Sequence, residues 1–275
     1  MEGDARREVA TFHFSEESGA MGPLLFWIHW IHVLAAVIWI GTVYFFNFFL
    51  TPFLAKTRAE MRVEVFRGLV PLTLAWFRWA ALVTVLSGGL IYGHWVASVG
   101  SAVFFYWPHG LAISVGGLLG IVMFVNGWFV MHPHQEIVIA SATRVAQGGQ
   151  PNPAAAAHSR RVVLASRTNL LLSIPMFFFM VAAGHGPSMT TMSQTASPTW
   201  FWIVTLVVIG AIEINVMTGL QGAFKKPLDS LAGTLAAGFV LLAVFYVLLE
   251  IIRSARALCT TILESLRTSC ANFLA

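Results

Sequence analysis

Histidines inside apolar segments are the first residues of this sequence that could do chemistry. The run from Trp27 to Gly41 reads WIHWIHVLAAVIWIG and places His29 and His32 three residues apart, on one face of a helix. Neutral imidazole binds haem iron, copper and other transition metals. Because an imidazole is costly to bury among apolar residues, each of the two histidines is a candidate for a functional site.

The composition predicts the surroundings of these histidines. Hydrophobic residues make up 57% of the 275-residue chain and charged residues only 10%, and the mean hydropathy is +0.77. These values lie outside the range of soluble domains and predict an integral membrane protein. We therefore expect the lipid bilayer as its main partner and no nucleic acid.

Six segments are long enough to cross the membrane. A hydrocarbon core of about 30 Å needs about 20 helical residues, and the apolar runs show no period-2 alternation, which excludes barrel strands. The expected fold is an all-α transmembrane bundle, a single domain over 23–252 between a polar segment at 1–22 and a short tail at 253–275. We place the spans at 23–52, 69–97, 109–131, 163–184, 200–220 and 231–252.

Basic residues predict the orientation of the spans. The segments that follow the first, third and fifth spans carry Lys and Arg, whereas 98–108 and 186–199 carry neither. By the positive-inside rule, the N-terminus and the C-terminus both lie outside. We expect Pro133 to end the third span, and the stretch QEIVIASATRVA after it to form a short helix at the cytoplasmic interface.

This topology brings five of the nine histidines toward the outer face on four spans: His29, His32, His94, His109 and His185. Imidazoles from facing helices commonly hold a b-type haem, so the cluster favours a haem site. The alternative is an aromatic belt of histidine and tryptophan at the membrane interface, and we favour it for His94 and His109 because both lie at span ends. His32 lies deeper in the membrane than His94 and His109, and Trp39 follows it by one heptad.

Five further polar residues fall inside the spans: Arg78, Asn126, Arg167, Asn169 and Glu213. Polar groups inside a bilayer tend to face one another in the bundle interior, so we expect a buried network. One interpretation is a structural salt bridge between Glu213 and an arginine. The other is a path for an anion or a proton, with Glu213 as the proton carrier.

Several stretches together resemble the membrane domain of the bacterial membrane-bound urate oxidases, also called cytochrome c urate oxidases. They are WIHVLAAVIWIGTVYFF (30–46), WFRWAALVTVLSGG (76–89), LGIVMFVNGWFVMHPHQEIVIA (119–140), ASRTNLLLSIPMFFFMVAAGH (165–185), IEINVM (212–217) and FYVLLEI (245–251). The positions that match the family pattern are His32, Trp39, Arg78, Asn126, Gln135, Arg167, Asn169, Pro175 and His185. The resemblance implies a multi-pass protein of the bacterial inner membrane that oxidises urate and passes electrons to a cytochrome c domain fused after the last helix.

One departure from that family changes the expected function. The tail at 253–275 contains no CxxCH, the motif that attaches a c-type haem. We therefore expect a membrane redox subunit that holds haem b with His32 and His185 as axial ligands, near His29, His94, His109 and Trp39, and relays electrons to a separate cytochrome. The alternatives are urate oxidation with a separate cytochrome c as acceptor, and a non-catalytic subunit of a larger respiratory or photosynthetic complex.

Overall fold

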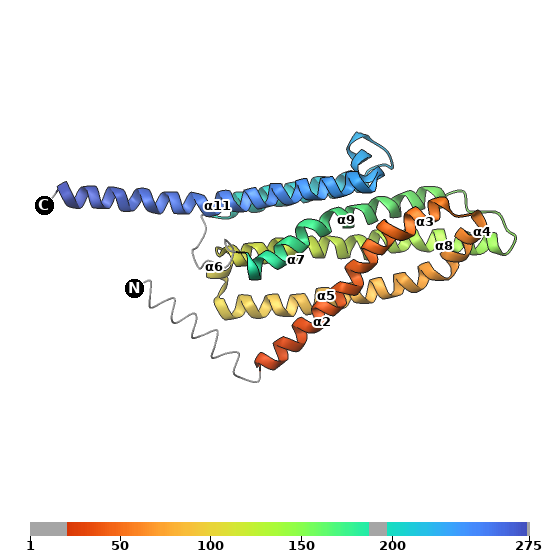
Figure 1. Cartoon of the computed structure of the whole chain (residues 1–275), viewed down its shortest axis with the longest axis horizontal. Coiled ribbons are helices and arrows are strands. Elements are labelled where there is room, and N and C mark those ends of the chain that lie inside the picture. The colour runs from red at the N-terminus through yellow and green to blue at the C-terminus, as the bar shows by residue number, and fades with distance from the viewer. Residues whose placement is uncertain (1–20, 187–196, 274–275) are drawn as a thin grey trace.

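The computed structural model describes residues 21–186 and 197–273. Over these two ranges the regular structure is helical throughout, with no strand (Figure 1). Six of the helices are long and apolar enough to span a membrane, which confirms the predicted all-α multi-pass fold. They cover Gly22–Lys56, Ala59–Val99, Pro108–Ala146, Ala155–His185, Thr199–Met217 and Leu231–Ala255.

Short elements subdivide several of these spans. The first consists of α2 (Met21–Tyr44), the π-helix η1 (Phe45–Leu50) and α3 (Thr51–Lys56), and the second of α4 (Ala59–Arg67) and α5 (Leu69–Val99). After α6 (Ser101–Phe104), the third consists of α7 (Pro108–Val125), the π-helix η2 (Asn126–Met131) and α8 (His132–Ala146). Then follow α9 (Ala155–His185), α10 (Thr199–Met217), the 3₁₀ helix η3 (Ala223–Asp229) and α11 (Leu231–Phe273).

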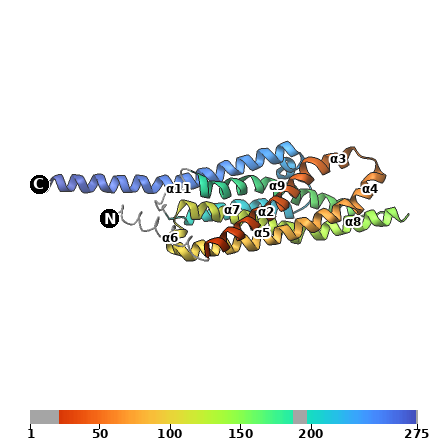
Figure 2. The same ribbon diagram turned by 60° about the horizontal axis from the view of Figure 1, so that its bottom comes forward.

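Two spans are twice as long as a membrane requires. Ala59–Val99 has 41 residues and Pro108–Ala146 has 39, so each is about 60 Å long against a core of about 30 Å. Figures 1 and 2 show α4 and α8 side by side at the end of the bundle opposite α6. This end therefore projects beyond the bilayer, and the loops predicted to be cytoplasmic gather there.

The expected helix end at Pro133 is wrong. The third span continues through Pro133, so the stretch QEIVIASATRVA is helical but belongs to the same rod as α7. Pro133 has no N–H to donate and stands in the first turn after η2, where α-type hydrogen bonding restarts. The helix α11 continues to Phe273, so most of the tail at 253–275 is helical and extends past the bundle (Figure 1).

The helix α9 occupies the centre of the bundle. Every residue from Leu164 to Ser173 is buried, so this part of the helix has no face toward lipid. It lies between α7 and α11 in both views (Figures 1 and 2) and also contacts α2, α8, α10, η1 and η2. A helix covered on all sides is the one place where a bilayer protein can carry several polar side chains.

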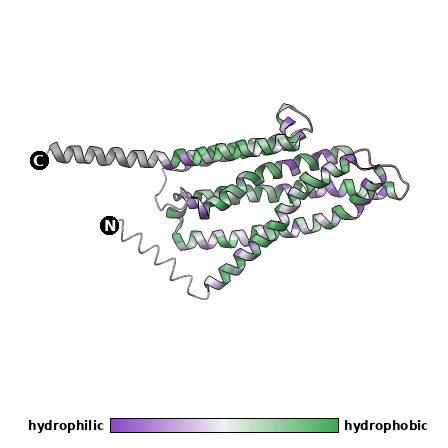
Figure 3. Ribbon diagram, in the orientation of Figure 1, coloured by the Kyte–Doolittle hydropathy of each residue, from purple (hydrophilic) through white to green (hydrophobic). Residues whose placement is uncertain are grey.

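The outer surface of the bundle is apolar. Large hydrophobic side chains are exposed on α2, α5, α10 and α11, among them Val37, Leu86, Val207 and Val240. Figure 3 colours long stretches of these helices as hydrophobic. Because exposed apolar surface of this extent is unfavourable in water, we conclude that these faces contact lipid.

Close contact between α11 and α9 depends on Gly238. A Cβ atom there would lie 2.9 Å from the backbone oxygen of Leu171 and 2.5 Å from Cδ1 of Ile174. We predict that Gly238→Ala destabilises the protein by about 1–3 kcal/mol, because α11 must move away from α9. Gly120→Ala is the control, since its Cβ meets no atom within 4 Å. Thermal unfolding in detergent measures both, and equal melting temperatures would contradict the prediction.

Candidate functional site

A run of polar residues lies on the buried part of α9, with the sequence Ser166, Arg167, Thr168 and Asn169. Arg167 is 7% exposed and Asn169 is fully buried. Thr168 donates its hydroxyl to the carbonyl of Leu164 on its own helix. Of the other three, Ser166 and Asn169 form side-chain hydrogen bonds with neighbouring helices.

Asn169 joins α9 to the third and fifth spans through Asn126. The Nδ2 atom of Asn126 donates to Oδ1 of Asn169 at 3.2 Å and to Oε1 of Glu213 at 3.0 Å. Asn169 in turn donates to the carbonyl oxygen of Met123 at 3.0 Å. The structure therefore brings together three of the five predicted network residues, and Asn126 is the link between them.

The salt bridge considered for Glu213 does not form. Its hydrogen-bond donor is the amide of Asn126, and no ion pair in residues 21–186 and 197–273 includes Glu213. Glu213 lies on α10, whereas Arg78 lies on α5 and Arg167 on α9. The carboxylate is therefore held by a neutral partner, which leaves its charge uncompensated.

A second asparagine reaches α9 from the first span. Asn47 is buried in η1, and its Nδ2 donates to Oγ of Ser166 at 2.9 Å and to the carbonyl oxygen of Val43 at 2.8 Å. The sequence analysis missed both Asn47 and Ser166. The signal was present, since Asn47 interrupts the apolar run FFNFFL as Asn126 interrupts the third span.

Both asparagines lie in π-helical turns. In η1 the N–H of Thr51 bonds to the carbonyl of Phe46, and in η2 the N–H of His132 bonds to that of Gly127, both five residues back. Each π turn is followed by a proline, at Pro52 and Pro133. Widened turns of this kind are frequent at functional sites, and here both present an amide to the same short stretch of α9.

Arg167 is the one member of this run whose charge is not paired. Its side chain makes no hydrogen bond and no ion pair anywhere in the described chain, and its Nη1 atom is buried without a partner. A buried guanidinium with no counter-charge is strongly unfavourable. The guanidinium fork matches the adjacent oxygens of an oxyanion, so we take the polar centre (Asn47, Asn126, Ser166, Arg167, Asn169 and Glu213) as the candidate site.

Arg78, the fifth predicted network residue, lies in another cluster. Its Nη1 donates to Nε2 of His132 at 2.7 Å, and its guanidinium lies over the ring of Trp128 at 4.5 Å. Glu136 also approaches His132, with Oε1 3.2 Å from Nε2. This cluster connects α5 with η2 and α8 rather than with α9.

The environment of His32 fits a metal-ligating histidine. Its Nδ1 donates to the carbonyl oxygen of Thr84 at 2.9 Å, with Oγ of Ser87 at 3.2 Å. This bond fixes the proton on Nδ1 and leaves Nε2 as a free lone pair, the arrangement common behind ligating imidazoles. The ring packs on Gly88, where a Cβ atom would lie 2.8 Å from Cε1.

No contact joins His32 to His185. His185 is exposed at the end of α9, and its Nδ1 lies 3.3 Å from the carbonyl of Val181 one turn back. Among the hydrogen bonds of the described residues, none connects the two histidines. That they share one iron therefore stays a prediction.

The other three histidines of the predicted cluster, His29, His94 and His109, lie toward the end of the bundle where α6 is. His29 is exposed and bonds to the carbonyl of Leu25, and His94 approaches Ser98 on its own helix. His109 stacks on Trp107 at 4.7 Å and bonds to the carbonyl of Ala183. In the part of the chain with described side chains, no group of three or more metal-binding side chains occurs.

Trp39 lies in the hydrophobic core. It is 2% exposed, and its indole N–H has no partner among the described residues. Because His32 and Trp39 are seven residues apart on α2, they lie on nearly the same side of that helix. Trp39 thus lies on the same side of α2 as His32, about two turns further along the helix and in the hydrophobic core.

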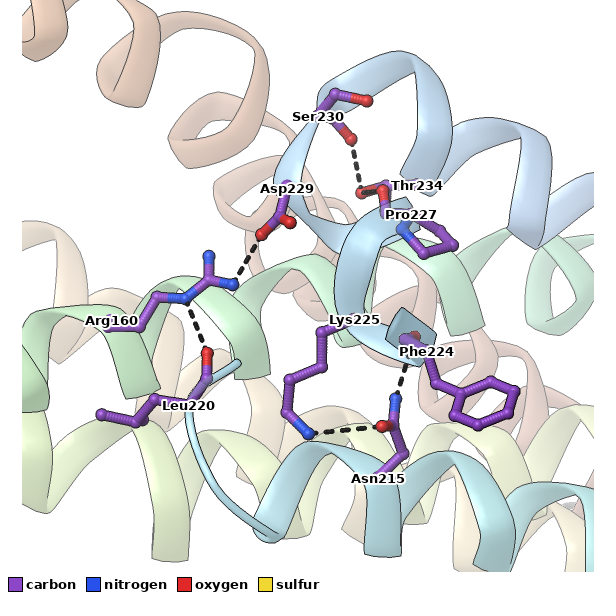
Figure 4. A network of polar contacts seen from close by, with 9 residues as sticks. All are labelled: Arg160, Asn215, Leu220, Phe224, Lys225, Pro227, Asp229, Ser230 and Thr234. Atoms are coloured by element: carbon purple, nitrogen blue, oxygen red, sulfur yellow. Dashed lines mark hydrogen bonds and ion pairs between the residues drawn. The ribbon is translucent and has the colours of Figure 1, made fainter. Parts of the chain in front are cut away.

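A further network of polar contacts lies at the C-terminal end of α10 (Figure 4). The buried Lys225 donates to Oδ1 of Asn215 at 3.3 Å and to the carbonyl of Thr218 at 2.7 Å, while Arg160 binds Asp229 and the carbonyl of Leu220. Cations at the carbonyl end of a helix satisfy its last acceptors and its dipole. These charges therefore have a structural role and form no ligand site.

Comparison of the chain with protein-family models, with curated proteins and with solved structures finds no match.

The hydrogen bonds of Asn126 should dominate the stability of the polar centre. Asn126→Ala leaves an acceptor on the buried Asn169 and one on the half-buried Glu213 without a donor, so we expect a loss of about 2–4 kcal/mol. Glu213→Gln is the matched control, because its amide oxygen still accepts from Asn126. Thermal unfolding in detergent compares the two variants, and a Glu213→Gln loss as large as that of Asn126→Ala would contradict the assignment.

Proposed function

We propose that this protein binds a small, oxygen-rich anion at the polar centre and oxidises it, with urate as the substrate and a separate cytochrome c as the electron acceptor. The observation that carries the proposal is Arg167, a buried guanidinium with no counter-ion in the described chain. A bound anion supplies the missing charge at this position.

The donors and acceptors of the polar centre suit urate. Urate is a planar anion whose rim alternates carbonyl oxygens with ring nitrogens, and a guanidinium fork pairs with two such adjacent atoms. The carboxamides of Asn126 and Asn169 can each donate and accept, as recognition of a heterocycle edge requires. A site built of hydrogen-bonding groups discriminates strongly against analogues that lack those groups.

The resemblance to membrane-bound urate oxidases supports the same substrate. Arg167, Asn126 and Asn169 are among the positions that match that family's pattern. Oxidation of urate with addition of water releases two electrons and two protons, so the reaction needs a proton acceptor and an electron acceptor. Glu213, which accepts a hydrogen bond from Asn126, is the base that we propose, and a separate cytochrome c takes the electrons.

Urate binding tests the proposal directly. Purified protein in nanodiscs should bind radiolabelled urate, and Arg167→Gln should weaken binding at least about tenfold through loss of a charged hydrogen bond. Arg144→Gln, on the exposed end of α8, is the control and should bind as the wild type does.

An activity assay completes this test. Membranes that contain the protein should consume urate when oxidised cytochrome c is added, with reduction of the cytochrome. If the wild type binds no urate, or if Arg167→Gln binds it normally, the proposal is wrong.

A second candidate function is electron transfer through haem b, favoured by the hydrogen bond from His32 to the carbonyl of Thr84. This bond holds the imidazole in the tautomer that ligates iron through Nε2. Haem b would supply one-electron transfer at this site. The role of Thr84 and Gly88 would be to orient the His32 ring, while His185 is the axial partner that we infer from the sequence.

A pyridine haemochrome assay separates this candidate from the first. We expect His32→Ala to lose the haem and His29→Ala, one turn away and exposed, to retain it. Absence of haem from the wild type would reject the haem function and leave urate binding untouched. A protein that binds neither haem nor urate would match the third interpretation, a structural subunit of a larger complex.

A further inference from the structure

The cluster of Arg78, Trp128 and His132 lies at the boundary of the hydrocarbon core. Trp79 is about 20 residues from the end of α5 at Val99, and Trp128 is about 20 residues from the start of α7 at Pro108, so each lies about 30 Å from the α6 end. The two rings touch, with centroids 6.4 Å apart. Two independent helices thus place the cluster at the same membrane interface.

The surface around the cluster has the features of a headgroup region. Trp76 and Trp79 on α5 are 61% and 63% exposed, as in the aromatic belts that lie level with lipid headgroups. Beyond them, Lys56, Arg58, Arg62 and Arg67 lie along α3 and α4. A basic segment at this depth attracts anionic lipids at about 1 kcal/mol for each residue.

Three N–H donors of the cluster have no acceptor. Arg78 Nη1 can only donate, so Nε2 of His132 accepts its hydrogen bond and the proton of that imidazole resides on Nδ1. This Nδ1–H, the Nε–H of Arg78 and the Nε1–H of Trp128 are all buried and unpartnered within the described structure. Each unsatisfied donor costs about 1–3 kcal/mol, so these three N–H groups are available to bind an oxyanion.

The charges around these donors favour the binding of an anion with moderate affinity. Arg78 contributes a positive charge held over the Trp128 ring. The opposing group is Glu136, whose Oε1 lies 3.2 Å from His132 Nε2 but whose side chain is 64% exposed and therefore well screened. None of Arg78, Trp128 and His132 is fully buried, so a ligand can reach them from the rim of the bundle after a change of side-chain rotamer.

We propose that Arg78, Trp128 and His132 bind the phosphate of an anionic phospholipid. The exposed Trp76 and Trp79 favour a lipid over free phosphate, because only a lipid has acyl chains for these side chains to contact. The site joins α5 to η2 and α8, whereas the polar centre lies around α9. The proposal is therefore independent of urate oxidation.

Lipid binding by matched variants tests this site. Purified, delipidated protein in detergent is titrated with phosphatidylglycerol, with phosphatidylcholine and with inorganic phosphate, while native mass spectrometry counts bound lipid and thermal unfolding follows stability. We expect phosphatidylglycerol to bind and to raise the melting temperature more than phosphatidylcholine. Trp128→Phe, which keeps the ring but removes the N–H, and Arg78→Gln should weaken that binding about tenfold.

Arg253→Gln is the control, because Arg253 lies on α11, outside this basic segment, and pairs with Glu250. It should bind phosphatidylglycerol as the wild type does. Wild-type affinity in Trp128→Phe would overturn the proposal even if Arg78→Gln failed to fold. An equal response to inorganic phosphate, lost in Trp128→Phe, would overturn the lipid assignment in favour of free phosphate.

Discussion

The burial of a polar stretch inside a bilayer is the constraint on which the rest of this structure depends. The hydrocarbon core offers no water to satisfy polar groups, so Ser166, Arg167 and Asn169 need partners from within the protein. The fold meets this need for Ser166 and Asn169 by placing α9 at the centre, covered by the other spans. The apolar outer faces of those spans then meet the lipid.

The two π turns follow from the same constraint. Each carries an asparagine toward α9, where Asn47 meets Ser166 and Asn126 meets Asn169. A π turn inserts an extra residue into the helix and so changes which side chains face the centre. The proline after each turn then occupies a position where no N–H is required. The π turns of the first and third spans thus lie where their asparagines can bond to the polar residues of the fourth span.

This arrangement gives the asparagine amides hydrogen-bond partners, but it does not bring the arginines into contact with Glu213. Asn126 binds both Asn169 and Glu213, yet Arg167 and Arg78 belong to different clusters and neither pairs with Glu213. Arg167 lies about 18 residues before the end of α9, or about 27 Å, which is close to the depth of Arg78. Two guanidiniums, each with at least one unpartnered N–H group in the described structure, therefore lie at one level of the membrane, one inside the bundle and one at its rim. Their different surroundings favour a small anion for the first and a lipid headgroup for the second.

The sequence by itself determined the number, the helical nature and the approximate positions of the six spans, because hydropathy over 20 residues depends only on local composition. It also identified Asn126, Asn169 and Glu213 as buried polar residues, which the structure brings into one network. The tertiary structure decided which side chains meet. Span order does not specify helix neighbours, so the partner of Glu213, the contact of Asn47 with α9 and the separation of Arg78 from Arg167 became visible only in the packed bundle. The continuation of the third span through Pro133 also became visible only in the structure, since a proline often ends a helix and here instead follows a widened turn.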